Sequence, residues 1–150
     1  MSVNTSAGTL LHISAIAPAT FDAPGYVALA WLPVGEIVDP GEFGRKYALV
    51  SHTPVATRGV QKFKGSFNEG TMAMTMGLDS VDTGQMALRT ASKLDTPVSL
   101  KITLPSGTIY YFQALVMEFV VTGLTVDNIT SASCSLELTT TKAGVGIITV

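Results

Sequence analysis

The segment from Arg58 to Ala91 constrains the fold more than any other part of the chain. Residues 58–67 and residues 70–78 each alternate between two kinds of side chain, and a period of two is typical of a half-buried β-strand. The letters SFNEG between them contain Asn and Gly, which favour the turn of an antiparallel hairpin. The sequence therefore predicts a strand, a tight turn and a second strand, with Met72, Met74, Met76 and Leu78 on one face.

A helix is expected directly after this hairpin, over about residues 82–94. Asp82 is a good N-cap, and Gln85 follows three residues later, as in a capping box. Val81 and Met86 occupy the positions of a hydrophobic staple. The helix should end by Thr96, because Pro97 disfavours helical geometry in the residue before it.

The rest of the chain is dominated by strand patterns. A turn at residues 105–107 is expected to join two strands into a second hairpin. These patterns indicate a single mainly β domain over residues 1–150, a β-sandwich or barrel-like fold with one flanking α-helix. The further expected strands are Tyr26–Leu32, Tyr47–Val55, Val98–Leu104, Ile109–Thr122 and Ser131–Thr140.

The composition leaves little charge for the outer surface. Charged residues make up 13% of the chain, against about 25% in an ordinary soluble domain, and hydrophobic residues make up 47%. Either the surface is rich in Thr and other small residues, or copies of the chain cover it. The net charge of −2 excludes a large basic face for static binding of nucleic acid. No apolar run reaches the roughly 18 residues of a membrane span, and the N-terminus does not resemble a signal peptide.

The residues that usually carry catalysis do not form a recognisable pattern. His12 and His52 are far apart, and no known catalytic or metal-binding motif surrounds them. Asp39 and Glu42 are best explained as solvated acids of a turn. Cys134 is the single cysteine and lies in an apolar alternation, so we expect an inert core thiol. We therefore expect no enzymatic activity, no cofactor and no metal.

One charge cluster has a pattern, the basic ladder of Arg58, Lys62 and Lys64 on one strand face. It can be a solvated face without a function. It can also form salt bridges to a neighbouring subunit, or bind phosphate. The acids considered as partners in the neighbouring subunit are Glu69, Asp79 and Asp82.

The order of these parts resembles the central signature of siphophage tail tube proteins. That signature has a basic strand ending in Lys-Gly-Ser, an Asn-x-Gly-Thr turn, an acidic pair and a Gly-Gln-x-x-Leu helix. The segments GEIVDPGEFG and FQALVMEFVVTGLTVDNIT are also similar to family segments, so the resemblance covers about residues 10–140. The matching signature residues are Lys62, Lys64, Gly65, Ser66, Asn68, Gly70, Thr71, Asp79, Asp82, Gly84, Gln85 and Leu88.

The resemblance implies a structural virion protein. Its subunits would form hexameric rings that stack into a hollow tail tube, through which DNA passes during ejection without specific binding. The implied partners are further copies of the chain, a tape-measure protein, and terminator and baseplate or tip proteins. The tail would be assembled in the host cytoplasm. An N-terminal arm (1–10), an inter-ring loop (34–45) and a C-terminal arm (141–150) are the expected appendages.

A conduit for DNA should present Ser, Thr and acids, because a Lys- or Arg-rich lumen would retain phosphates. The outer face of the last long strand fits this requirement, and Glu118 is a second candidate. We expect the 34–45 loop to contact the next ring through Glu36, Ile37, Asp39, Glu42 and Phe43. The expected lumen-facing residues are Glu118, Ser131, Ser133, Ser135, Glu137 and Thr139.

Two other classes of protein remain open from the sequence. One is the inner tube of a type VI secretion system or of a contractile tail, which the resemblance links to the same fold. The other is a small β enzyme or ligand-binding domain, for which a convergent polar pocket would be needed.

Overall fold

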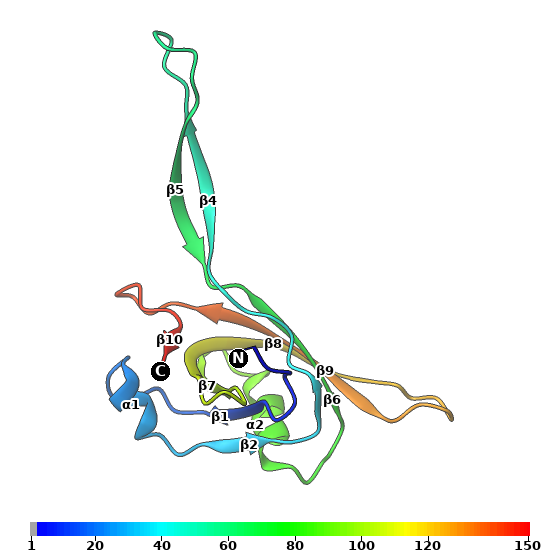
Figure 1. The fold of residues 1–150 in the computed structure, drawn as a ribbon. Coiled ribbons are helices and arrows are strands. Elements are labelled where there is room, and N and C mark those ends of the chain that lie inside the picture. The colour runs from blue at the N-terminus through cyan, green and yellow to red at the C-terminus, as the bar shows by residue number, and fades with distance from the viewer. Residues whose placement is uncertain (1–2) are drawn as a thin grey trace.

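The computed structural model describes residues 3–150, and the chain folds into a β-rich body with two projections (Figure 1). Ten strands and two helices occur in that range. In chain order they are β1 (Leu10–Ser14), α1 (Ala23–Val27), β2 (Leu32–Val34), β3 (Ile37–Asp39), β4 (Lys46–His52), β5 (Gln61–Asn68), β6 (Thr71–Gly77), α2 (Thr83–Ala91), β7 (Val98–Thr103), β8 (Ile109–Thr122), β9 (Ser131–Thr139) and β10 (Ile148–Thr149).

The body is one antiparallel sheet that curls around its own core. Its strand order is β2-β1-β7-β8-β9-β6-β3, and β10 pairs with β8 near the start of that strand. Strand β8 is 14 residues long, so its first part pairs with β7 and its second part with β9. This length lets β8 curve from one half of the sheet into the other (Figure 1). The predicted mainly β, sandwich-like fold with a flanking helix is confirmed.

Alternating side chains on β6 and β9 provide the centre of the core. Met72, Met74 and Met76 are fully buried, as their period of two predicted. Each lies opposite a buried residue of β9, for example Met74 opposite Cys134. Burial raises the pKa of the Cys134 thiol to about 12, so the thiol is protonated at neutral pH. The prediction of a buried core thiol is confirmed.

Helix α2 is held against the sheet by the residues of its first turn. Asp82 is the N-cap, and its carboxylate accepts a hydrogen bond from the Gln85 amide at 3.0 Å. The Gln85 side chain does not complete the capping box. It donates instead to the carbonyls of Gly35 and Gly77, both at 2.9 Å, and accepts from the Asp79 amide at 2.9 Å. Gln85 therefore ties two segments to the helix, the connection between β2 and β3 and the end of β6 with the turn that follows it.

The hydrophobic staple expected at the start of the helix is wrong. Val81 is 85% exposed, so it forms no hydrophobic staple with Met86. Its amide donates to the Asp79 carboxylate, and this turn directs the Val81 side chain to solvent. The helix ends at Ala91, before Thr96 as expected.

The predicted strand at Tyr26–Leu32 is wrong, because that segment starts in helix α1 and then becomes a turn. Asp22 caps α1 by accepting from the Gly25 amide at 2.9 Å, and Pro24 lies in its first turn. The Tyr26 ring stacks on Tyr111 with 5.2 Å between ring centroids. The packing of this aromatic pair therefore outweighs the β preference of an apolar run.

The predicted hairpin over residues 58–78 is also wrong. Strands β5 and β6 do not pair with each other: β5 pairs with β4, and β6 pairs with β9 and β3. Asn68 accepts a hydrogen bond from the Gly70 amide at 2.8 Å, and Gly70 has a φ of 104°. These residues bend the chain from one sheet into the other without reversing it. The second predicted hairpin, β7 with β8, is confirmed.

We predict that Gln85→Leu lowers the free energy of unfolding by about 3 kcal/mol, because two carbonyls and one amide lose a buried partner. Urea denaturation of the monomer measures this change. Gln61→Leu on exposed β5 is the matched control and should change the free energy by less than about 0.5 kcal/mol. Equal losses in the two variants would contradict the bridging role of Gln85.

Candidate assembly surfaces

The outer face of β6, β9 and the second part of β8 forms a polar surface, which we call the polar face. Its residues lie directly opposite one another in register, for example Ala73 opposite Ser135 and Ser135 opposite Glu118. The face includes two acids and no Lys or Arg. Its members are Thr71, Ala73, Thr75, Glu118, Val120, Ser131, Ser133, Ser135 and Glu137.

A bulge in β8 places Glu118 on the polar face. The register between β8 and β9 shifts between Val116 and Glu118, so Met117 has no direct partner. Before the bulge, Val116 lies on the core side; after it, Phe119 does. Without this extra residue, Glu118 would point into the core. The expected lumen-facing residues Glu118, Ser131, Ser133, Ser135 and Glu137 thus share one surface.

Hydrogen bonding orders part of this face. The Thr71 hydroxyl donates to the Glu137 carboxylate at 2.8 Å, across the β6–β9 pair. Thr139 is on the same side of β9 but beyond the polar face, opposite the buried Gln113. It lines a separate groove together with Phe21 and Pro97.

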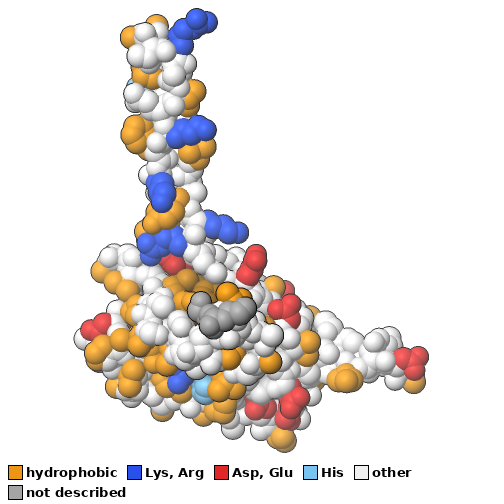
Figure 2. Space-filling view, viewed as in Figure 1, with side chains coloured by type: hydrophobic (Ala, Val, Ile, Leu, Met, Phe, Trp, Pro, Cys, Tyr) orange, Lys and Arg blue, Asp and Glu red, His pale blue; other side chains and the backbone are white. Residues whose placement is uncertain are grey.

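The hairpin of β4 and β5 projects from the body, and we call residues 45–68 the basic arm (Figure 1). It holds five of the nine Lys and Arg residues and none of the eleven Asp and Glu residues, so the rest of the chain has a net charge of −7. Figure 2 shows Lys and Arg side chains along the projection and Asp and Glu side chains on the body. Arg58, Lys62 and Lys64 all lie on this arm and are exposed.

The basic arm also exposes large apolar side chains. Leu49 is 68% exposed, Phe63 is 54% exposed and Val55 at the tip is fully exposed. A two-stranded hairpin without further packing is marginally stable in water. An exposed apolar surface on such an element marks it as a contact surface.

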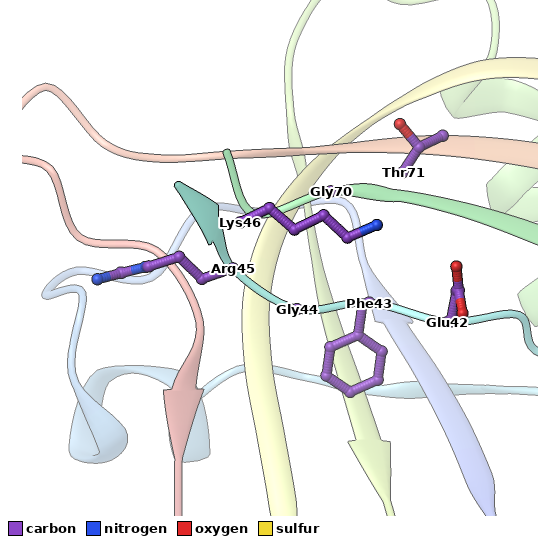
Figure 3. Close-up of a pocket in the computed structure, with 7 residues that line it drawn as sticks. All are labelled: Glu42, Phe43, Gly44, Arg45, Lys46, Gly70 and Thr71. Atoms are coloured by element: carbon purple, nitrogen blue, oxygen red, sulfur yellow. The ribbon is translucent and has the colours of Figure 1, made fainter. Parts of the chain in front are cut away.

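An ion pair fixes the arm at its base. The Arg45 guanidinium donates to the Glu69 carboxylate at 2.7 Å, and Glu69 is 2% exposed. The guanidinium also lies 3.9 Å from the centre of the Phe67 ring. Hydrogen bonds from the guanidinium to Tyr47 and to Glu69 raise the pKa of Arg45. Figure 3 shows Arg45 and Lys46 extending in opposite directions where the chain leaves the body.

The three acids that were candidate partners of the basic ladder have different environments. Glu69 is buried against Arg45 of its own chain. Asp82 caps α2 and also accepts from the Gly35 amide at 3.1 Å. Asp79 lies in the turn before α2, where its carboxylate accepts from the Val81 amide. None of them lies on the basic arm.

The segment 34–45 is not a free loop, because it contains β3, which pairs with β6. Ile37 packs on the core, and the Phe43 ring lies 5.1 Å from Tyr110 and 5.6 Å from Phe112 between centroids. Glu36, Asp39 and Glu42 are the acids of this segment. The basic arm follows this segment directly and projects from the body, and the sequence patterns did not predict this projection. The lack of acids over residues 45–68 was the available signal.

Residues that could carry chemistry are separated in the described part of the chain. Within residues 3–150, no group of three His, Cys, Asp or Glu side chains could hold a metal ion, and no helix there is long and apolar enough to cross a membrane. The buried Nδ1 atom of His12 has no hydrogen-bond partner among these residues. Burial, and then the charge of Lys101, lower the pKa of His12.

Comparison with known proteins identifies the fold. No protein-family description matches the sequence, and no curated protein matches it. A chain in the cryo-EM structure of the anti-feeding prophage baseplate superposes with a TM-score of 0.71 at 9% identity, over 99% of this chain and 95% of that chain. A chain in the sheath/tube terminator of the PVC extracellular contractile injection system gives 0.66 at 9% identity, over 99% and 96%.

A type six secretion system protein is also similar, with a TM-score of 0.50 at 11% identity, over 95% of this chain and 90% of that chain. At such identities the likeness defines the fold. The chain therefore has the same fold as these chains from contractile injection systems and from a type six secretion system.

We predict that Arg45→Met loosens the basic arm, because the buried Glu69 carboxylate loses its partner and Phe67 loses a cation. Amide hydrogen exchange in β4 and β5 of the monomer should become faster. Lys62→Met, which removes a charge from the exposed part of the arm, is the control and should leave these rates nearly unchanged. Identical exchange in Arg45→Met and wild type would contradict a fixed base.

Proposed function

We propose that the chain is a structural tail tube subunit without catalytic activity, whose copies form rings that stack into a hollow tube. The observation that carries this proposal is the polar face. One side of β6, β8 and β9 packs the core, while the other presents hydroxyl groups and two carboxylates. A channel wall needs this combination, because phosphates pass over it without being retained.

The basic arm supports the same proposal from the outside of the subunit. The arm carries five positive charges, and the rest of the chain has a net charge of −7. The charge of the arm of one copy therefore complements the charge of the body of another copy. The arm's exposed Leu49, Val55 and Phe63 would be covered in such a contact. We propose that the arm joins successive rings. In that role it replaces the 34–45 segment, whose Ile37 and Phe43 pack on their own subunit.

In its specific form, the proposal is a major tail tube protein of a siphophage. Hexameric rings would grow around a tape-measure protein between a baseplate or tip complex and a terminator. The tube would conduct DNA during ejection, as part of a virion assembled in the host cytoplasm. The signature at residues 62–88 supports this form.

The second candidate is an inner-tube component of a contractile tail or of a type VI secretion system. It is favoured by the similar structures, which come from contractile injection systems and a type six secretion system. A sheath around the tube in isolated particles would establish the contractile form, and bare tubes would establish the siphophage form.

Electron microscopy of the purified protein tests the proposal. Tubes roughly 100 Å across, the scale of six small domains around a pore, are expected. Stable single rings would favour the secretion-system candidate. A monomer at every concentration would contradict a tube subunit and favour a small ligand-binding β domain.

We predict that the double variant Ser133→Lys, Ser135→Lys still forms tubes but retains DNA, because lysines on the polar face would bind phosphates. In a phage that carries the chain, infective titre should fall by at least ~10-fold while tails look normal. Ser106→Lys in the exposed turn between β7 and β8 is the control. A normal titre would contradict a lumen lined by this face.

We predict that the double variant Lys62→Glu, Lys64→Glu assembles poorly, because it removes the charge complementarity of the basic arm. Sedimentation should show rings or monomers in place of tubes. A salt concentration of about 1 M should also weaken wild-type assembly, because exposed charges more than about 3 Å apart are then largely screened. Arg89→Glu, at an exposed position of α2, is the control. Equal losses of assembly in the two variants would exclude a specific role for the arm.

A further inference from the structure

The turn between β8 and β9 forms the second projection of the body (Figure 1). We call residues 123–130 the apolar tip. Leu124 is 74% exposed, Val126 is 99% exposed and Ile129 is 81% exposed, so they project into solvent. The tip carries one charged residue, Asp127. Three large apolar side chains around one acid make this turn a poor solvent-facing loop and a good contact surface.

A groove lies at the opposite end of β9, and we call it the apolar groove. Its volume is about 760 Å³. It is bordered by the chain after β1, by the residues before β7 and by the segment that follows β9. Lys142 is its one charged residue, and no acid occurs among the lining residues described. The apolar lining residues are Ala15, Ala17, Phe21, Pro97 and Ala143, and the uncharged polar ones are Thr96, Gln113, Thr139, Thr140 and Thr141.

We propose that the apolar tip of one copy fills the apolar groove of a second copy, with Asp127 beside Lys142. This inference rests on the proposed function and names the contact between neighbouring subunits. The occupant is a second copy because the single charges of the two surfaces are opposite, and the large exposed side chains of the tip would meet a groove that exposes mostly apolar surface. The wall offers small side chains, Ala15 and Ala17, against which a large Leu, Val or Ile packs.

The placement of the two surfaces determines the symmetry of the contact. Tip and groove lie at opposite ends of β9, whose nine residues span roughly 30 Å. A contact between different surfaces of identical copies is head-to-tail, and it closes into a ring when the rotation between copies permits closure. Each copy then uses its tip once and its groove once. A symmetric dimer is not expected from this contact.

Cysteine cross-linking between two copies tests the contact. Val126→Cys and Ala17→Cys are made in separate proteins, both at exposed positions, and circular dichroism checks that each folds. The native Cys134 stays in place, because it is buried and its pKa is raised to about 12. Under mild oxidation, the mixture should give a disulfide-linked heterodimer as the main new species. Each protein alone should give none, which makes the single variants matched controls.

The outcomes separate this inference from the proposed function. If the mixture forms tubes without the 126–17 disulfide, the tip-to-groove contact is wrong and the tube proposal survives. If the tip of one copy links to the tip of another, the contact is symmetric and the inference is also wrong. If the protein never assembles, both proposals fail.

A charge exchange provides a second readout. Asp127→Lys and Lys142→Asp should each raise the concentration needed for assembly by ~5-fold, because each places like charges together. The double variant should recover most of the wild-type value. A double variant that assembles no better than the two single variants would overturn the pairing of tip and groove.

Discussion

The register of strand β9 couples the core of the domain to its polar face. The strand lies between β6 and β8, and its alternation of small apolar and hydroxyl residues faces two different environments. Ala132, Cys134 and Leu136 close the core against the three methionines of β6. The same backbone geometry presents Ser133, Ser135 and Glu137 on the polar face. A shift of one residue in either pairing would exchange the two environments, so core stability and the chemistry of the surface depend on one register.

In the proposed assembly, the folded monomer would be an incomplete unit whose projections contact other copies. The basic arm and the apolar tip both expose large apolar side chains, and the body exposes others, such as Ile16, Val27 and Met117. The bend at Asn68–Gly70 and the Arg45–Glu69 ion pair hold the basic arm away from the body. Assembly would cover these surfaces and supply the packing that an isolated hairpin lacks. The low charge content of the chain has the same explanation, because much of its surface would lie between copies.

The sequence predicted the mainly β fold, the alternation of β6 and β9, the long β8 and helix α2, since each depends on a local periodicity or cap. Apart from the β7–β8 hairpin, it did not predict which strands pair. The Asn-Gly signal at residues 68–70 is a bend, and only long-range pairing with β4 and β9 distinguishes a bend from a hairpin turn. Helix α1 was missed because the Tyr26–Tyr111 stacking that stabilises it joins residues far apart in the sequence.

Among the candidate site residues, those of β9 depend on alternation alone, which made their common face predictable. Glu118 shares that face through the bulge at Met117, which the sequence did not reveal. From the sequence, Glu69 was a candidate partner for the basic ladder of a neighbouring subunit. It is instead buried against Arg45 at the base of the arm, and this burial depends on a bend that the sequence did not predict.

A cryo-EM reconstruction of the assembled protein would show which face of the subunit lines the channel. We expect a hollow tube in which Ser133, Ser135, Glu118 and Glu137 line the channel and the basic arm contacts the next ring. A tube whose channel is lined by another face, or in which β9 is buried between subunits, would contradict this expectation.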